Sequence, residues 1–238
     1  MTQVLPVLII VFFAAFTQSV AGFGAALVCM SLLTLLLPIT FVTPLVAMMG
    51  TFITISIFLR LRRHFDIKKV LPLVAGALPG IPVGIYFLTH FPENIVKKIL
   101  AIVLLIYSLY SLLHVTHNTI LRKEWGYLFG FLSGCLGGAF NTNGPPAIIY
   151  TSMQSWNKND ITITLQSFFL LSGIMLITMH GFHGLITVEV LHYFVLTLPV
   201  LIMGVVAGSF VYERINQDVF KKIVFILLIV LAVVLFFS

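Results

Sequence analysis

The stretch from Gly137 to Tyr150 reads GGAFNTNGPPAIIY and separates two apolar runs of the chain. Its middle holds four residues of types that favour helix caps and turns, namely Asn141, Thr142, Asn143 and Gly144. Two prolines follow, and proline suits the first turn of a helix because N–H groups there have no acceptor within the helix. The sequence therefore predicts one helix that ends before this stretch and a second that begins near Pro145.

The two apolar runs around this break differ in length, and the second is too short to cross a membrane. Trp125 to Phe140 has 16 residues, and Pro145 to Trp156 has 12. At about 1.5 Å per residue the second run covers roughly 18 Å, whereas the hydrocarbon core of a bilayer is about 30 Å thick. We therefore expect a re-entrant hairpin whose tip lies near the bilayer midplane. Unpaired N–H groups at such a tip carry a partial positive charge, which favours an anion.

The composition is that of an integral membrane protein. Of the 238 residues, 60% are hydrophobic and 8% are charged, and the mean hydropathy is +1.15. The net charge is +6, but the cations lie in short loops between apolar runs, so they predict topology and no nucleic-acid partner. Cys29 and Cys135 lie within apolar segments, where reduced, packed thiols are expected. The first apolar segment lacks a basic leader and a cleavage site, so we expect the mature protein to keep it.

Ten apolar segments follow one another, and they fall into two sets of five that suggest a duplication. The segments are Val4 to Val20, Gly24 to Leu37, Phe41 to Leu59, Val70 to Thr89, Ile95 to Val115, Trp125 to Phe140, Pro145 to Trp156, Ile161 to Met179, Val190 to Tyr212 and Val219 to Phe237. A shift of 124 residues aligns GIPVG at 80–84 with GVVAG at 204–208, and ENIVKKI at 93–99 with QDVFKKI at 217–223. A shift of 120 residues places Ala21 to Gly24 on Asn141 to Gly144. The sequence thus predicts a first transmembrane repeat at 1–115, a cytoplasmic linker at 116–124 and a second repeat at 125–238.

The basic loops decide how the two halves are oriented. The loop 60–69 carries five of the thirteen Lys and Arg residues, so we place it in the cytoplasm. If each half crosses an odd number of times, eleven of the thirteen lie inside and only Lys97 and Lys98 lie outside, whereas four crossings give seven against six. The odd count predicts inverted repeats with both termini outside the cytoplasm and two hairpin tips that meet near the midplane. It leaves open five spans per half or three spans plus a re-entrant hairpin.

Polar side chains inside the apolar segments are further candidates for a binding site. Gln18, Gln166 and Ser167 are costly to bury without partners and lie in segments beside the two tips, so each is expected either to line the site or to bridge helices. Single hydroxyls usually bond back to their own helix, and only a minority should touch substrate. The hydroxyls in question are Thr51, Thr54, Ser56, Ser172 and Thr178.

Glycines and titratable groups complete the inventory. A ladder of small residues predicts close helix packing within the chain, with a homodimer seam as the alternative; its members are Gly76, Gly80, Gly84, Gly204 and Gly208.

Glu189 and His192 share a helical face at the start of a span, where interfacial solvation is expected and proton coupling is the alternative. The chain contains no HExxH, GxSxG or phosphate-loop motif, so no metal, cofactor or enzymatic activity is expected.

Three motifs together resemble a known family: AGFG at 21–24, GGAFNTNGPPA at 137–147 and AGALPGIPVG at 75–84. With the duplicated layout, they are similar over nearly the whole chain to the sulfite and organosulfonate exporter family, the TauE/SafE-type membrane transporters. The resemblance implies secondary transport of small anions, commonly sulfur oxyanions or sulfonates, across the bacterial cytoplasmic membrane. It fixes neither the substrate nor the direction of transport.

The sequence therefore predicts an all-helical carrier in the cell membrane that moves a small anion by alternating access. From one side the anion would be held by the N–H groups after Pro146 and by Asn141, Thr142, Asn143, Gly144 and Pro145, with the Asn143 side chain either capping the second helix or reaching the anion. From the other side it would be held by Gly22, Phe23, Gly24 and the N–H groups of Ala25 and Ala26. An anion or small-solute channel and a structural membrane protein without transport are the alternatives. The coupling ion, a proton or another ion, stays open.

The charge count makes a prediction about topology. A reporter that is active only in the cytoplasm should be active when fused within 60–69 or 214–221 and inactive when fused after Ser238, because the odd count places only the first two positions inside. Fusions at all three positions, compared at equal expression, provide the measurement. An active reporter after Ser238 would exclude the inverted repeat.

Overall fold

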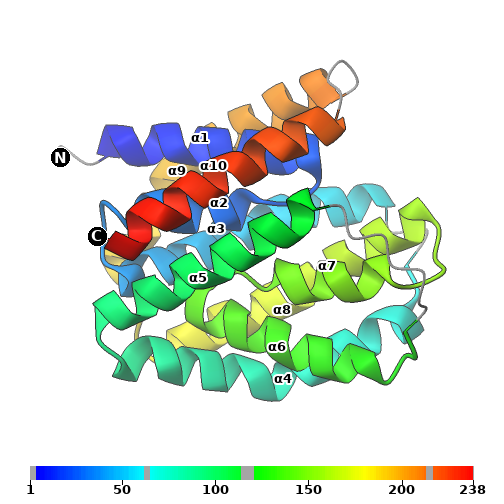
Figure 1. The fold of residues 1–238 in the computed structure, drawn as a ribbon. Helices are drawn as coiled ribbons and strands as arrows, with labels where there is room; N and C mark the ends of the chain where they lie inside the picture. Colours follow the sequence, from blue (N-terminus) through cyan, green and yellow to red (C-terminus); the bar gives the residue numbers. More distant parts are fainter. Residues whose placement is uncertain (1–3, 62–64, 114–120, 213–216, 238) are drawn as a thin grey trace. The chain divides into compact units, whose positions relative to one another are not determined.

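In the computed structural model, residues 4–61, 65–113, 121–212 and 217–237 are described, and they form ten α-helices and no strands (Figure 1). The helices of the first half are α1 (Val4–Ala21), α2 (Ala25–Leu33), α3 (Ile39–Leu61), α4 (Ile67–His90) and α5 (Glu93–Leu112). Those of the second half are α6 (Trp125–Phe140), α7 (Gly144–Ser152), α8 (Lys158–Phe182), α9 (Val188–Tyr212) and α10 (Gln217–Phe237). The predicted all-helical fold is confirmed for these residues. The predicted linker 116–124 lies partly outside them.

Two helices are shorter than predicted. α2 ends at Leu33 rather than Leu37, and α7 ends at Ser152 rather than Trp156. Pro38 disfavours helical conformation in the residue before it, which helps to end α2 early. Each of these helices has nine residues and is therefore about 14 Å long.

Several helices are long and apolar enough to cross a membrane. The five longest such stretches are Val4–Ala21, Ile67–His90, Glu93–Leu112, Asn159–Phe182 and Val188–Val211. Two shorter apolar helical stretches, Ile39–Ile55 and Lys222–Phe237, belong to α3 and α10. By length and composition the chain is a multi-pass membrane protein.

The helices form two compact units that do not coincide with the two halves of the sequence. Unit 1 comprises Met1–Met49, Phe91–Val115 and Thr187–Ser238, and unit 2 comprises Gly50–His90 and Thr116–Ile186. Unit 2 therefore contains α4 of the first half beside α6, α7 and α8 of the second. Unit 1 contains α9 and α10 of the second half beside α1, α2 and α5 of the first. α3 contributes residues to both units.

Glycines bring α4 and α6 into backbone contact in unit 2, where the two helices lie side by side (Figure 1). A Cβ atom added at Gly76 would lie 2.1 Å from the carbonyl oxygen of Tyr127, and one added at Gly84 would lie 2.1 Å from that of Cys135. Because both partners advance by eight residues, the two helices run in the same direction. The ladder packs within the chain, as predicted.

Unit 1 builds the same kind of contact between α1 and α9. A Cβ atom at Gly204 would lie 2.6 Å from the carbonyl oxygen of Phe12, and one at Gly208 would lie 2.8 Å from that of Phe16. α1 and α9 therefore also run in the same direction. Each unit thus joins the first helix of one half to the fourth helix of the other through small residues.

The helix bounds move the alignment of the two hairpins by one residue. α1 ends at Ala21 and α2 begins at Ala25, whereas α6 ends at Phe140 and α7 begins at Gly144, so both pairs are related by a shift of 119 residues. Gly22 (φ 82°) then corresponds to Asn141 (φ 51°), and both residues adopt the left-handed conformation directly after a helix. The predicted shift of 120 matched Gly24 with Gly144 by residue type, but the positive φ angle is the feature that the turn requires.

Replacing a glycine of this ladder should destabilise the protein. A Cβ atom at Gly80 would lie 2.3 Å from the carbonyl oxygen of Phe131, so Gly80→Ala forces α4 and α6 apart and should cost about 1–3 kcal/mol. The measurement is the thermal unfolding midpoint in detergent. Gly181→Ala is the matched control, because the nearest atom to its Cβ would lie 3.9 Å away. Equal midpoints for the two variants would contradict the close contact.

Candidate functional site

The segment around Asn141 to Gly144 is the tip of a helical hairpin that returns to the end at which it began. Before α6, the N–H of Leu121 donates to the carbonyl oxygen of Met153 (3.2 Å), and Gln154 Nε2 donates to the carbonyl oxygen of Leu121 (3.2 Å). Near the start of α6, the ring of Phe129 lies 6.0 Å from that of Tyr150 on α7. α6 and α7 are therefore antiparallel arms of one hairpin within unit 2.

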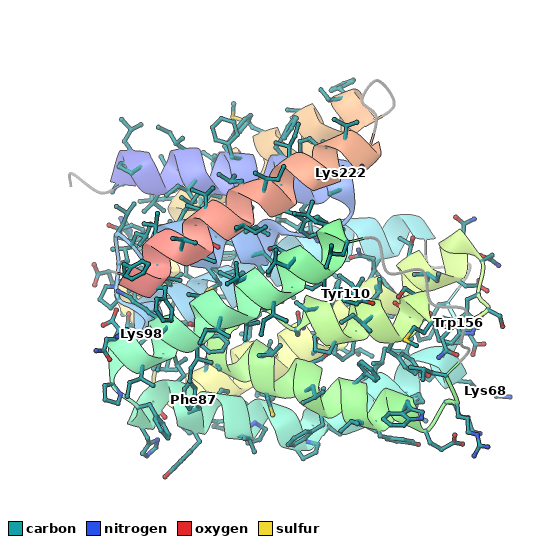
Figure 2. All side chains as sticks on the ribbon, in the orientation of Figure 1. Lys68, Phe87, Lys98, Tyr110, Trp156 and Lys222 are labelled. Atoms are coloured by element: carbon teal, nitrogen blue, oxygen red, sulfur yellow. The ribbon has the colours of Figure 1, made fainter. Side chains whose placement is uncertain are left out.

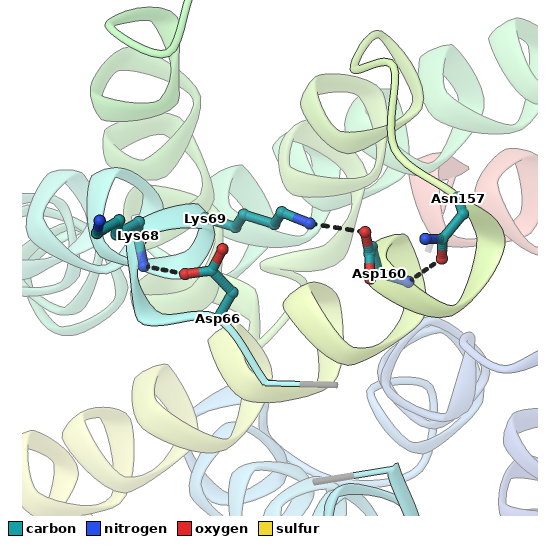
Figure 3. A network of polar contacts seen from close by, with 5 residues as sticks. All are labelled: Asp66, Lys68, Lys69, Asn157 and Asp160. Carbon is teal, nitrogen blue, oxygen red and sulfur yellow. Dashed lines mark hydrogen bonds and ion pairs between the residues drawn. The ribbon is translucent and has the colours of Figure 1, made fainter. Parts of the chain in front are cut away.

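Charged residues mark the open end of this hairpin (Figure 3). Lys69 Nζ, at the start of α4, lies 2.6 Å from Asp160 Oδ2 at the start of α8, and it also lies 5.3 Å above the ring of Trp156. The Asp66 and Asn157 side chains accept hydrogen bonds from the N–H groups of Lys68 and Asp160. α4, α6 and α8 thus all begin at one end of unit 2. The charge count predicts that this end lies in the cytoplasm.

The tip lies at the opposite end of the hairpin, beyond the midpoint of α4. In Figure 2 Lys68 and Trp156 lie together at the charged end of unit 2, and Phe87 lies toward the other end. The ring of Phe140, the last residue of α6, lies 6.2 Å from that of Phe87. Phe87 stands three residues before the end of α4. Measured along α4, the tip therefore lies near the helix end that is remote from Lys68, and its position at the bilayer midplane stays a prediction.

Asn141 makes the turn at the tip. The N–H of Asn141 donates to the carbonyl oxygen of Gly137 (2.7 Å), and the N–H of Thr142 donates to that of Leu136 (3.3 Å). The first of these bonds is that of an αL helix end, with Asn141 in the left-handed position, which asparagine tolerates better than most residues. Thr142 is only 1% exposed, and its Oγ1 has no hydrogen-bond partner among the residues that the structure describes.

Asn143 fastens the tip to α8. Its Nδ2 donates to Ser172 Oγ (2.7 Å), which in turn donates to the carbonyl oxygen of Phe168 (2.7 Å). Asn143 occupies the N-cap position of α7, but its side chain makes no capping hydrogen bond. Of the two roles predicted for Asn143, capping is therefore not observed. The half-buried side chain remains beside the tip, tied to α8.

The start of α7 at Gly144 changes the set of backbone donors expected at the tip. Pro145 and Pro146 occupy the second and third helical positions and have no N–H. The N–H that follows Pro146 lies at the fourth position, where the carbonyl of Asn143 accepts it in a regular helix. In a regular helix, the N–H groups predicted to bind from beyond Pro146 would therefore be used within α7. Gly144 and the side chains of Asn141, Thr142 and Asn143 remain as donors.

The hairpin tip of unit 1 is capped by a side chain instead. Gln18 Oε1 accepts a hydrogen bond from the N–H of Ala25 (3.0 Å), so Gln18 bridges α1 to the start of α2. Gly24 has φ 108°, which a residue with a side chain rarely adopts. The ring of Phe23 stacks on that of Phe225 in α10 at 5.8 Å. Of the residues predicted for this tip, Gln18 and Phe23 thus make contacts within unit 1 that hold the tip in place. The N–H of Ala26 lies in the first turn of α2, where backbone N–H groups have no acceptor within the helix.

Gln166 and Ser167, the two candidate binding residues on α8, lie on different faces of this helix. Ser167 Oγ donates to the carbonyl oxygen of Ile163 (2.7 Å), so this hydroxyl bonds back to its own helix. Gln166 is 2% exposed and stands three residues before Phe169, whose Cζ would lie 3.7 Å from a Cβ atom at Gly144. Residues three apart share a helical face. The face of α8 that carries Gln166 therefore points toward the hairpin, and the face that carries Ser167 does not.

Around the tip in unit 2, sequence reasoning missed Gly50 and Gly173, whereas Thr51 and Ser172 were among the hydroxyls of which a minority was expected to touch substrate. Asn141 Nδ2 would lie 3.9 Å from a Cβ atom at Gly50 of α3, and Thr51 Oγ1 would lie 2.3 Å from one at Gly173 of α8. With Ser172, these residues surround the tip from α3 and α8. Gly173 was the available signal, because a glycine inside a span usually marks the close approach of another group.

The described residues contain no group of three or more His, Cys, Asp or Glu side chains that could hold a metal ion. Comparison with known proteins identifies one family: the family model described as "Sulfite exporter TauE/SafE" matches residues 7–235. No curated protein and no solved structure matches the chain.

The contact between Asn143 and Ser172 can be tested by removing one hydroxyl. Ser172→Ala should lower the free energy of unfolding by about 0.5–1.5 kcal/mol, because the Asn143 amide loses its partner. Thermal unfolding in detergent measures this effect. Thr178→Ala is the control, since Thr178 Oγ1 donates only to the carbonyl oxygen of Ile174 on an exposed face of the same helix. A loss no larger for Ser172→Ala than for the control would argue against the contact.

Proposed function

Because the chain belongs to the TauE/SafE sulfite exporter family, we propose that it is a secondary carrier that exports sulfite or a related small sulfur anion, such as thiosulfate or an organosulfonate. It would act in the cytoplasmic membrane of the cell and leave its substrate chemically unchanged. The observation that carries this proposal is the buried polar tip of the hairpin in unit 2, where Thr142 Oγ1 lacks a partner among the described residues. A buried polar group of this kind points to a ligand or a water molecule.

The tip offers an anion neutral donors rather than a fixed positive charge. No Lys or Arg occurs in the sequence from Glu124 to Asn157 or from 159 to 213. The Thr142 hydroxyl, the Asn143 amide and the Gly144 N–H at the start of α7 would donate hydrogen bonds to the anion's oxygens. Neutral donors suit a carrier, because an empty site then leaves no unpaired charge buried in the membrane.

Alternating access is the mechanism that we propose for the transport cycle. Each half of the sequence contains a short hairpin and three longer helices, and the corresponding helices have similar lengths. Two similar halves in opposite orientations could exchange conformations, which would turn an inward-open carrier into an outward-open one. Gly22, Phe23, Gly24 and the start of α2 would form the matching tip in the other half.

Counterflow in proteoliposomes tests this function against the alternatives. Vesicles loaded with unlabelled sulfite should accumulate labelled sulfite transiently, because a carrier exchanges one solute molecule for another across a closed membrane. A panel with thiosulfate, sulfoacetate, taurine and a non-sulfur carboxylate would define the substrate. Uptake that never exceeds equilibration would favour a channel, and vesicles that take up no more than protein-free controls would indicate a protein without transport.

Two substitutions at Asn143 sharpen the test. Asn143→Ala removes one hydrogen bond to a charged ligand, which is worth about 1.5–3 kcal/mol, so the apparent affinity should fall roughly tenfold to a hundredfold. Asn143→Asp keeps the side chain's size, and Ser172 can donate to the new carboxylate, but the added negative charge repels the anion. Asn143→Asp should therefore transport less than Asn143→Ala while unfolding at a similar temperature. Wild-type transport by Asn143→Asp would remove this residue from the site.

A further inference from the structure

His180 is a fully buried histidine whose ring makes no hydrogen bond among the residues that the structure describes. It is 0% exposed, and both Nδ1 and Nε2 lack a partner. Buried hydroxyls such as Ser133 and Thr164 also lack partners, but a neutral imidazole presents both a donor and an acceptor in fixed directions. Leaving both unsatisfied in a membrane protein is costly, so such a group calls for an explanation.

The side of α8 that carries His180 is the side that contacts the hairpin. Phe169 Cζ would lie 3.7 Å from a Cβ atom at Gly144, and Leu176 Cδ1 would lie 3.4 Å from one at Gly137. His180 follows Leu176 by four residues and therefore lies on the same face, one turn further along α8. Ile174, on the opposite face of the helix, is 51% exposed. His180 therefore faces the interior of unit 2.

Two contacts place His180 at the level of the hairpin tip. The Lys69–Asp160 ion pair aligns the starts of α4 and α8, and α6 runs parallel to α4 through its glycine contacts. Further along, Leu176 of α8 meets Gly137 of α6. His180 follows Leu176 by four residues on α8, and Asn141 follows Gly137 by four residues at the end of α6. By this register the ring of His180 lies about one turn beyond the contact of Leu176 with Gly137, as Asn141 does, while Asn143 on the returning arm bonds to Ser172, two turns before His180.

We propose that His180 is part of the anion site, where its ring N–H donates to an oxygen of the transported oxyanion. This inference rests on the proposed transport function and extends it to α8. The ligand class is a small anion with at least two acceptor oxygens, one for the imidazole N–H and one for the Thr142 hydroxyl. The other ring nitrogen accepts from water or from a proton carried by the anion.

The test compares three variants in binding, transport and stability. His180→Leu replaces a partnerless ring with an apolar side chain, so it should unfold at the wild-type temperature or above, yet its sulfite counterflow should fall about tenfold or more. His180→Gln retains an N–H donor and should keep a larger share of the counterflow. His183→Leu is the matched control, because His183 stands three residues further on and is exposed, and it should transport like wild type.

The outcomes separate a ligand-binding ring from a structural one. Wild-type counterflow by His180→Leu would overturn the proposal, and so would a loss of transport that merely follows a lower unfolding temperature. If the wild type itself moves no anion of the panel, the proposed function fails. In that case the rise in unfolding temperature on adding sulfite decides the matter: its presence in the wild type and absence in His180→Leu supports the anion site, and its absence in both refutes it.

Discussion

Direct contact between helix backbones is the constraint on which the rest of the structure depends. α4 and α6 approach so closely that a single Cβ atom at Gly76, Gly80 or Gly84 would overlap a carbonyl group of α6. In a bilayer, where burial of apolar side chains gives little driving force between helices, such close packing supplies much of the association energy. It also fixes the register of α6 along α4, and with it the position along α4 at which the hairpin turns.

That register determines what the tip can do. A turn at Asn141, held by two backbone hydrogen bonds and by the Asn143–Ser172 contact, points its polar groups into protein rather than into lipid. Irregular backbone inside a membrane is tolerated only where protein or water surrounds it. The hairpin therefore combines a rigid scaffold with a buried hydroxyl, that of Thr142, which no described residue satisfies, and this combination suits the proposed small-anion site.

Local features of the sequence predicted much of this arrangement, and distant contacts could not be predicted from it. The turn residues at Asn141 to Gly144 and the apolar lengths sufficed for the hairpin, the ten helices and the membrane class. The packing of α4 with α6, and of α9 with α1, depends on pairs of surfaces more than 40 residues apart in the sequence. Ser172 as the partner of Asn143 likewise became apparent only in three dimensions. For Gln18, bridging helices was one of the two predicted roles, and the structure supplies its partner, the N–H of Ala25.

The residue types at the two tips illustrate where pattern and chemistry diverge. Residue-type matching aligned Gly24 with Gly144, yet the structural counterparts are Gly22 and Asn141, because each must adopt a positive φ angle at the end of a helix. Glycine meets that requirement with no side chain, whereas asparagine meets it while adding an amide. The tip in unit 1 is satisfied by Gln18, and the tip in unit 2 keeps a buried hydroxyl that no described residue satisfies. Two hairpins whose short arms have nine residues each can therefore serve unequal roles, and the asparagine-bearing one is the one that we propose to hold the anion.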